Sequence, residues 1–143
     1  MAENIVYLEL LRRGYDKDKI FYFKDEKHRE TDFVIREDQG FEAIQVCWNI
    51  GRPEVRSREI KGLLIAMEKF NLKEGLVLDG HSKGEEKVNG KLIKIMPLDL
   101  WLLNKGKSDA EFVGPAGAAD AVDIIFVRFR QIIIYDMGHI VNI

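Results

Sequence analysis

The stretch from Glu30 to Trp48 constrains the fold of this chain more than any other part of the sequence. Residues 33–35 and 41–48 are rich in β-branched and aromatic side chains, which favour a pleated and half-buried surface. The polar segment between these runs ends in Gly40 and has the composition of a tight turn. The stretch is therefore predicted to fold as a β-hairpin whose two strands lie in the core.

The sequence around this hairpin predicts the other elements of an α/β domain. Asn4 is predicted to cap a helix over residues 5–13, which Gly14 ends in a left-handed conformation. A second helix is predicted over 53–71, because Pro53 suits a first turn and the apolar positions recur with helical spacing. Those apolar positions are Ile60, Leu63, Leu64 and Met67. The remaining expected elements are strands over 20–23, 75–79 and 92–96, an Asn-Gly turn at 89–90, and a short helix after Pro97.

The order of these elements predicts a mixed sheet. A strand, a helix and a further strand imply a crossover connection, and therefore parallel pairing beside the antiparallel hairpin. We expect the second helix to pack Ile60, Leu64 and Met67 onto this sheet. The sheet is the one that contains Phe33, Ile35, Ile44 and Val46.

A change of composition at Asn104 divides the chain into three parts. Residues 1–103 form the predicted domain, residues 104–121 are rich in Gly, Ala and Ser and are predicted to be a linker, and residues 122–143 are a β-prone tail. Three interpretations of the tail stay open. It is an added edge strand, an element exchanged between the subunits of a homo-oligomer, or a poorly packed segment that favours aggregation.

Composition bounds the location of the protein and its partners. The single cysteine, Cys47, and the lack of a recognisable signal sequence fit a reducing, cytoplasmic location. There is no segment of about 20 uncharged apolar residues, so no membrane partner is expected. Charged residues make up 32% of the chain, which favours a thermophilic source. The three histidines are scattered without the spacing of a zinc site.

One cluster of cations is a candidate for contact with nucleic acid. The net charge of −2 argues against wrapping by a nucleic acid, although it leaves room for a local basic face. The cations of the second predicted helix are Arg52, Arg56, Arg58 and Lys61. A solvated helix face is one interpretation of this cluster, and nonspecific contact with phosphate groups is the other.

Three further polar residues have structural interpretations. Asp32, at the start of the first hairpin strand, either bonds to neighbouring backbone or is the remnant of a metal site. Gln45 interrupts the apolar centre of the second strand and is interpreted as a buried amide that a neighbouring strand or side chain satisfies. Glu9 is interpreted as the partner of Arg12 and Arg13 in an intrahelical ion pair, worth about a few tenths of a kcal/mol.

Together these motifs resemble those of the PD-(D/E)XK superfamily, which has the restriction-endonuclease-like fold. The segments that carry the resemblance are 3–14, 30–35, 44–46 and 58–59, and the similarity covers about residues 3–103. More closely, they resemble the C-terminal domain of archaeal and bacterial P-loop ATPases of the AAA-like group, a domain of unknown function. The resemblance implies a P-loop ATPase as partner, in the same or a neighbouring gene. The phosphate-binding motif of such an ATPase, Gly-x-x-x-x-Gly-Lys-Ser/Thr, does not occur in these 143 residues.

The resemblance also implies a site and its defects. In active superfamily members a helix glutamate, a strand aspartate and the acid of an acid-x-Lys motif bind Mg²⁺, and the lysine helps to activate water. The corresponding positions here are Glu9, Asp32, Gln45 and Cys47. Gln45 offers a neutral carbonyl, and Cys47 offers no cation and, when buried, an inert thiol. Glu9 and Asp32 would then hold Mg²⁺ or Mn²⁺ weakly, and Lys61 is the candidate for a replacement cation.

We therefore expect a noncatalytic, nuclease-like binding or regulatory domain that is associated with a P-loop ATPase and can contact nucleic acid. A divalent-metal-dependent nuclease with a rewired active site is the alternative. A structural or oligomerising fragment, with the tail as its contact, is a further alternative. The fold alone does not decide among them, because unrelated functions share the same folds.

Overall fold

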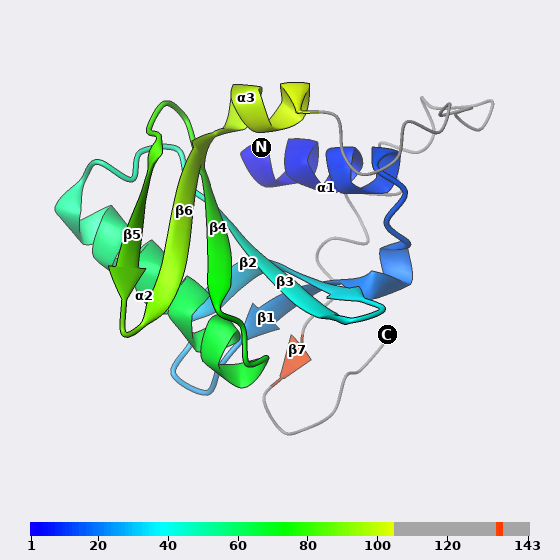
Figure 1. The fold of residues 1–143 in the computed structure, drawn as a ribbon, viewed down its shortest axis with the longest axis horizontal. Coiled ribbons are helices and arrows are strands. Elements are labelled where there is room, and N and C mark those ends of the chain that lie inside the picture. Colours follow the sequence, from blue (N-terminus) through cyan, green and yellow to red (C-terminus); the bar gives the residue numbers. More distant parts are fainter. Residues whose placement is uncertain (105–133, 136–143) are drawn as a thin grey trace.

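The computed structural model of this chain describes residues 1–104 and the two-residue strand at 134–135. Its helices are α1 (Ala2–Arg12), α2 (Pro53–Lys69) and α3 (Leu98–Leu103), with a short 3-10 helix, η1 (Lys17–Lys19). Its strands are β1 (Ile20–Lys24), β2 (Glu30–Glu37), β3 (Gly40–Val46), β4 (Glu74–Asp79), β5 (Gly84–Val88), β6 (Lys91–Pro97) and β7 (Ile134–Tyr135). All seven strands belong to one sheet, in the order β5-β6-β4-β3-β2-β1-β7 (Figure 1).

The predicted hairpin and mixed sheet are confirmed. Strands β2 and β3 pair antiparallel from Phe33 opposite Ile44 to Glu37 opposite Gly40, which leaves a two-residue turn between them. Strand β3 pairs parallel with β4, and α2 is the crossover between these two strands. Strand β6 adds a second parallel pair beside β4, while β5 joins β6 through the predicted Asn-Gly turn.

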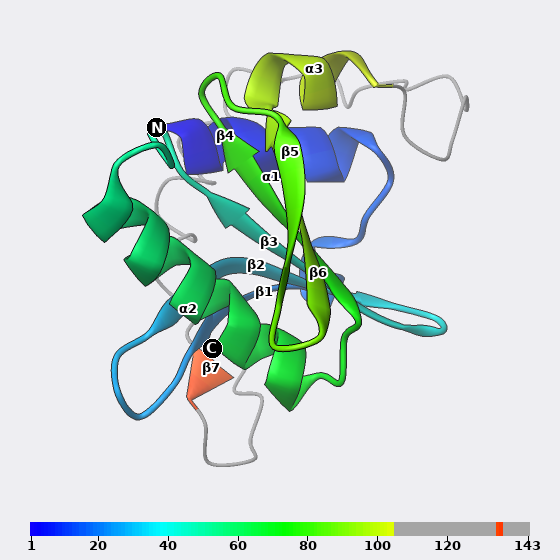
Figure 2. The ribbon, with the colours of Figure 1, turned by 60° about the vertical axis from the view of Figure 1, so that its left-hand side comes forward.

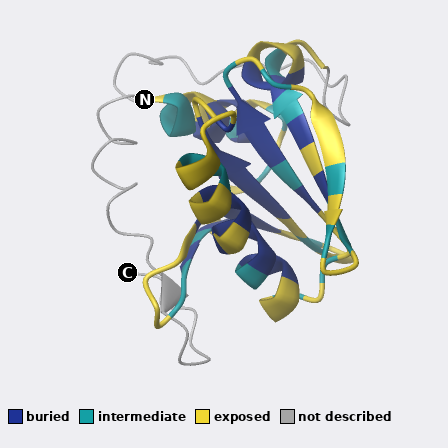
Figure 3. Ribbon diagram, turned by 90° about the vertical axis from the view of Figure 1, so that its left-hand side faces the viewer, coloured by how far each residue is buried: buried dark blue, intermediate teal, exposed yellow. Residues whose placement is uncertain are grey.

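Helices cover both faces of the sheet, α2 on one face and α1 with α3 on the other (Figures 1 and 2). The α2 face has a core that includes Phe21, Phe23, Val34, Ala43, Leu63, Met67, Val77 and Ile93. The opposite face has a core that includes Val6, Leu10, Phe33, Ile35, Ile44, Val46, Leu78 and Trp101. Figure 3 shows α2 buried on the side that contacts the sheet and exposed on its outer side. The described residues therefore form three layers around two cores.

The expected packing of α2 is confirmed for the helix, but the four sheet residues named with it belong to the other core. Ile60, Leu64 and Met67 are buried in the α2 core, as predicted. Phe33, Ile35, Ile44 and Val46 lie instead in the core beneath α1 and α3. Successive strand residues alternate between the faces, so the hairpin contributes Val34 and Ala43 to the α2 core.

The termini of α1 agree with the prediction only at its C-terminal end. The helix begins at Ala2 without a side-chain cap, so the expected cap by Asn4 is wrong. An acidic residue in the first turn, Glu3, suits the positive end of the helix dipole there. Gly14 has the expected left-handed conformation, with φ of 87°. The Gly14 and Tyr15 N–H groups donate to carbonyls of the last turn, which completes a Schellman motif.

Little of the C-terminal part of the chain is described. The predicted linker, 104–121, lies outside the described residues except for Asn104. Of the predicted tail, 122–143, only β7 is described. This strand pairs parallel with the end of β1, where Ile134 lies opposite Phe23 and Tyr135 opposite Lys24. It forms the edge of the sheet next to β1.

A close approach between α2 and β2 leads to a first prediction, at Gly62. A Cβ atom at this position would collide with the backbone carbonyl oxygen of Glu30, and the Thr31 hydroxyl donates to the Gly62 carbonyl at 2.9 Å. On an exposed helix, Gly→Ala stabilises by about 1 kcal/mol. Here we expect Gly62→Ala to lower the free energy of unfolding by about 1–3 kcal/mol, because backbone must move to make room.

Chemical denaturation of Gly62→Ala beside Ser57→Ala measures this effect. Ser57 is exposed on the same helix and provides an alanine substitution without a steric conflict. A Gly62→Ala variant at least as stable as the parent chain would contradict the close contact between α2 and β2.

Candidate functional site

Three of the four residues at the predicted site line one cleft. The cleft has a volume of about 830 Å³ and lies where β2 begins, β3 ends and α2 begins. Asp32, Gln45 and Cys47 all line it, and these are three of the four positions that the resemblance implies. A second cleft, of about 740 Å³, lies at the opposite end of β3 and contains none of the predicted site residues.

Asp32 and Gln45 each bond to the other strand at the point where the hairpin ladder ends. Phe33 and Ile44 are the last paired residues at this end. The Asp32 N–H donates to Oε1 of Gln45 at 3.3 Å, and the Val46 N–H donates to Oδ2 of Asp32 at 2.8 Å. Side-chain oxygens thus take the place of backbone carbonyls, and the prediction that Asp32 bonds to neighbouring backbone is confirmed.

A β-bulge accompanies this change of pairing. In the β1–β2 pair, Phe21 lies opposite Val34 and Phe23 opposite Thr31, so β2 has one more residue than β1 over this interval. A bulge re-aims the side chains of the strand that contains it and is common beside functional sites. The extra residue falls in the interval that contains Asp32.

Glu59 is a residue of this cleft that was not among the predicted site residues. It extends from α2, is only 8% exposed, and accepts a hydrogen bond from Nε2 of Gln45. Its other oxygen, Oε1, accepts from Nε and Nη2 of Arg58, at 2.9 and 2.6 Å. Gln45 therefore bonds at both ends of its amide, to the Asp32 backbone and to the Glu59 carboxylate, which confirms that it is a satisfied buried amide.

Burial gives Asp32 an unusual protonation equilibrium. Desolvation is the main cause that raises the pKa of its carboxyl group, to about 7, against the opposing hydrogen bond from the Val46 N–H. The negative charges of Glu3, Glu59 and Glu30 raise it further. A carboxyl group that titrates near neutrality inside a cleft is typical of functional sites.

Cys47 is an inert part of the cleft wall. Its side chain is 7% exposed and belongs to the core beneath α2. Burial raises the pKa of the thiol, and the charges of Glu59 and Asp79 raise it further. A protonated thiol is a poor nucleophile and a poor metal ligand, in agreement with the expectation for this position.

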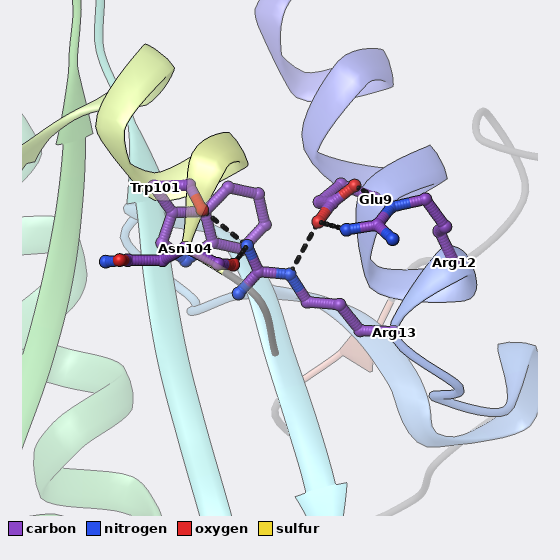
Figure 4. Close-up of polar contacts among 5 residues, drawn as sticks. All are labelled: Glu9, Arg12, Arg13, Trp101 and Asn104. Carbon is purple, nitrogen blue, oxygen red and sulfur yellow. Dashed lines mark hydrogen bonds and ion pairs between the residues drawn. The ribbon is translucent and has the colours of Figure 1, made fainter. Parts of the chain in front are cut away.

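Glu9 does not belong to the cleft. It bonds to Arg12 and Arg13 on its own helix, at 2.6 and 2.7 Å, so the predicted intrahelical ion pair is confirmed (Figure 4). The hydrogen bond from Arg12 lowers the pKa of Glu9 despite partial burial. The guanidinium of Arg13 also lies 4.0 Å from the centre of the Trp101 ring and donates to the Trp101 and Asn104 carbonyl oxygens. Glu9 thus helps to join α1 to α3 through Arg13. The acidic residue of α1 that lines the cleft is Glu3.

The predicted basic face of α2 is divided between different surroundings. Arg52 and Arg58 line the cleft, and Arg56 and Lys61 do not. Arg56 forms an ion pair with Glu86 of β5 at 2.9 Å. Lys61 is exposed outside the cleft, which places it away from the position of a replacement cation beside Cys47.

The carboxylates of the cleft are not gathered into a metal centre. Among residues 1–104, no group of three or more His, Cys, Asp or Glu side chains is arranged to hold a metal ion. The acids that line the cleft are Glu3, Glu30, Asp32 and Glu59. Glu30 forms an ion pair with Lys24 at 2.7 Å, and Glu59 is bonded to Arg58. Glu9 lies outside the cleft, so the predicted pair Glu9 and Asp32 does not meet there, and Asp32 is the member of that pair that lines the cleft.

Comparison with known proteins places the chain in a family. A family model described as "Domain of unknown function (DUF4143)" matches residues 1–101. The chain belongs to this family. The matched residues include α1, the whole cleft and most of α3, so the cleft described above lies within the part of the chain that matches the family.

A curated relative is much longer than this chain. The uncharacterized protein MJ1544 of Methanocaldococcus jannaschii is 33% identical to it over 112 residues. The match covers 72% of this chain and 24% of MJ1544, so the chain matches about a quarter of that relative's length. No solved structure matches the chain. Within the described residues, no helix is long and apolar enough to cross a membrane.

Proposed function

We propose that this chain is a noncatalytic, nuclease-like domain of the PD-(D/E)XK type that acts as a binding or regulatory module. The observation that carries the proposal is the bonding of Gln45. By the resemblance of motifs Gln45 corresponds to the third acid of an active site, and its amide bonds at one end to the Asp32 backbone and at the other to Glu59. A neutral side chain in this position lowers the affinity for Mg²⁺, and Cys47 supplies no cation to activate water.

The proposed ligand is nucleic acid, and the proposed associate is a P-loop ATPase. Arg52 lines the cleft without an ion pair among the described residues, so its charge is available to a phosphate group. Arg58 lines the same cleft and is bonded to Glu59, which reduces the positive charge that it can offer to a phosphate group. The ATPase association rests on the similarity of motifs described above. The greater length of MJ1544 leaves room for a further module in that relative.

A rewired nuclease is the second candidate, because Glu59 supplies an acid from α2 where β3 lacks one. Glu59 and Asp32 reach the same cleft, and Glu3 contributes a third carboxylate to its lining. In this alternative Asp32 and Glu59 would hold Mg²⁺ or Mn²⁺, which would stabilise the charge that develops on the phosphate group, and Arg58 would take the place of the lysine.

A cleavage assay separates the two candidates. We expect the full chain to leave plasmid, single-stranded DNA and RNA uncut in Mg²⁺ or Mn²⁺. Metal-dependent cleavage that both Asp32→Ala and Glu59→Gln abolish would overturn the noncatalytic proposal and support the rewired nuclease. Cleavage that survives both substitutions would identify a contaminating nuclease. That nuclease would be removed by further purification before the comparison is repeated.

The double substitution Gln45→Glu with Cys47→Lys is the positive arm of this test. The new glutamate would lie against Glu59 and Asp32, and mutual repulsion of the carboxylates makes a divalent cation the natural partner. We expect the variant to gain detectable metal-dependent cleavage and a melting temperature that rises when Mg²⁺ or Mn²⁺ is added. Gln39→Glu, on the exposed hairpin turn, is the matched control and should show neither effect. A double variant that neither binds metal nor cleaves would count against a PD-(D/E)XK ancestry of the cleft.

A further inference from the structure

The two tryptophans, Trp48 and Trp101, differ in their exposure to solvent. The Trp48 side chain is 66% exposed, whereas Trp101 is 6% exposed and lies in the core beneath α1 and α3. Trp48 follows the end of β3 and lines the same cleft as Arg52 and Asp32. Placing so large an apolar ring in water is unfavourable, and an exposed tryptophan on the rim of a cleft is typical of a contact surface.

The indole of Trp48 is nevertheless supported on one side. A Cβ atom at Gly80 would lie 3.4 and 3.5 Å from Cδ2 and Cε2 of the indole, so the ring lies directly against this glycine. The His81 ring approaches in an edge-to-face arrangement, with 5.9 Å between the ring centres. The tightest contact at Gly80 is with the Trp48 backbone carbonyl oxygen, 2.7 Å from such a Cβ atom, so glycine at this position permits the close approach of the two loop backbones.

A buried carboxylate fixes the two loops that meet at Trp48. Asp79, at the end of β4, is 2% exposed and accepts N–H groups from both loops. Its Oδ1 accepts from Ile50 at 2.8 Å, and its Oδ2 accepts from His81 at 3.1 Å and Ser82 at 2.8 Å. Burial opposes the charge, but these three backbone hydrogen bonds outweigh it and hold the pKa of Asp79 below its ordinary value. The Trp48 ring is therefore presented on loops that are already ordered.

We propose that Trp48 is a stacking platform for an unpaired base of single-stranded nucleic acid, with Arg52 as the contact for its backbone phosphate. This inference rests on the proposed contact with nucleic acid and specifies the kind of strand. Aromatic rings bind single strands by stacking on the faces of bases, which are covered by neighbouring bases inside a duplex. A ring supported on one side and open on the other provides one such stacking surface.

The charged side chains of the cleft determine where the phosphate groups of a nucleic-acid strand can bind. Glu3 and Glu30 also line the cleft, and their negative charges would repel phosphate groups. The cations of the lining include Arg29, Arg52 and Arg58, of which Arg29 is paired with Asp25 and Arg58 with Glu59. The phosphate next to the stacked base is therefore assigned to Arg52, which lies at the start of α2.

Binding measurements with the full chain test this inference. The probe is a fluorescein-labelled 12-nucleotide oligothymidylate, followed by anisotropy and by quenching of tryptophan fluorescence at low salt. We expect Trp48→Ala to weaken binding on the order of 5- to 100-fold and to abolish the quenching, while Trp48→Phe retains most of the affinity. Arg52→Ala should weaken binding and reduce the slope of log affinity against log salt by about 0.7. Lys61→Ala, which removes an exposed charge of α2 outside the cleft, should change the affinity less than Arg52→Ala.

The comparison ligands are a 12-base-pair duplex and thymidine monophosphate. Tighter binding of the single strand than of either ligand, lost in Trp48→Ala, supports the inference. Equal binding of strand and duplex, with Trp48→Ala unchanged but Arg52→Ala weakened, would overturn the inference and leave the proposed phosphate contact standing. The monophosphate binding as tightly as the strand would overturn the assignment to a strand. No binding of any nucleic acid would overturn both proposals.

Discussion

Replacing Leu63 with alanine is expected to lower the free energy of unfolding by about 2–5 kcal/mol. Leu63 is fully buried, and it contacts the sheet at Gly75 of β4 together with Met67. Removing its three outer carbon atoms takes away apolar contacts and leaves a cavity between α2 and the sheet, which the packed backbone around Gly75 cannot fill. Urea denaturation followed by circular dichroism measures the change.

Leu8→Ala is the matched control for this substitution. Leu8 is 41% exposed on α1, so the same change there is expected to shift stability by no more than about 0.5 kcal/mol. Leu63→Met keeps most of the volume and should cost less than about 1.5 kcal/mol, which keeps the test usable if the alanine variant does not fold. Similar losses for Leu63→Ala and Leu8→Ala would show that α2 does not cover the sheet as described.

The position of α2 could be predicted from the sequence, but the sheet face beneath it could not. Helical spacing of Ile60, Leu64 and Met67 identifies a buried stripe without reference to other elements. In β2, however, Phe33, Val34 and Ile35 are all almost fully buried. A strand buried on both faces has no alternation of polar and apolar residues, so its sequence does not distinguish one face from the other.

The site could be predicted in part for a similar reason. Gln45 interrupts an apolar strand and Asp32 stands at the start of one, and both features are visible in a sequence, whereas Cys47 was assigned to the site only by the similarity of motifs. Glu59 is one charged residue among many on α2, and nothing local separates it from a solvated glutamate. Its role depends on Gln45, 14 positions earlier, and only the packing of α2 on the hairpin brings the two together.

Glu3 and Glu9 show a difference between the similarity of motifs and the local sequence pattern. Both lie on α1, and the similarity of motifs assigned the site to Glu9. The two arginines in the next turn predicted the pairing of Glu9 correctly, since Arg12 and Arg13 both bond to it.

Strand β5 was not predicted because its sequence, Gly-Glu-Glu-Lys-Val, is mostly polar. Its pairing with β6 depends on the Asn-Gly turn, which was predicted.

Ionisation of Asp32 in the cleft lowers the free energy of unfolding by a measurable amount. In the folded chain the pKa is raised to about 7 from an ordinary value of 3.8, so the folded state binds this proton more tightly than the unfolded state. The stabilising effect of the proton is therefore complete below pH 3.8, declines as the pH rises, and is lost once the pH passes about 7. At about 1.4 kcal/mol for each tenfold change in the proton equilibrium, the upper limit of this cost is about 4 kcal/mol.

Asp32→Asn is accordingly expected to stabilise the protein at pH 8. The amide carries no charge to desolvate or to be repelled by Glu59, and its oxygen can still accept the Val46 N–H. The gain over the parent chain should be small at pH 4, grow up to about pH 7 and stay constant above it. Urea denaturation across this range measures the gain, and Asp38→Asn, whose side chain is 93% exposed, should give none.

A loss of stability in Asp32→Asn at pH 8 would contradict the raised pKa and assign Asp32 a structural role in closing the hairpin. The predicted gain would instead show that Asp32 is present although it lowers the stability of the fold. Substitutions that stabilise a protein at the expense of its function are typical of binding and catalytic sites.

If Asp32→Asn does stabilise the protein, addition of Mg²⁺ or Mn²⁺ to the parent chain at pH 8 distinguishes the remaining alternatives. A rise in stability that Asp32→Asn abolishes would assign the charge to a retained metal site, and no rise would leave a charged cleft without a metal.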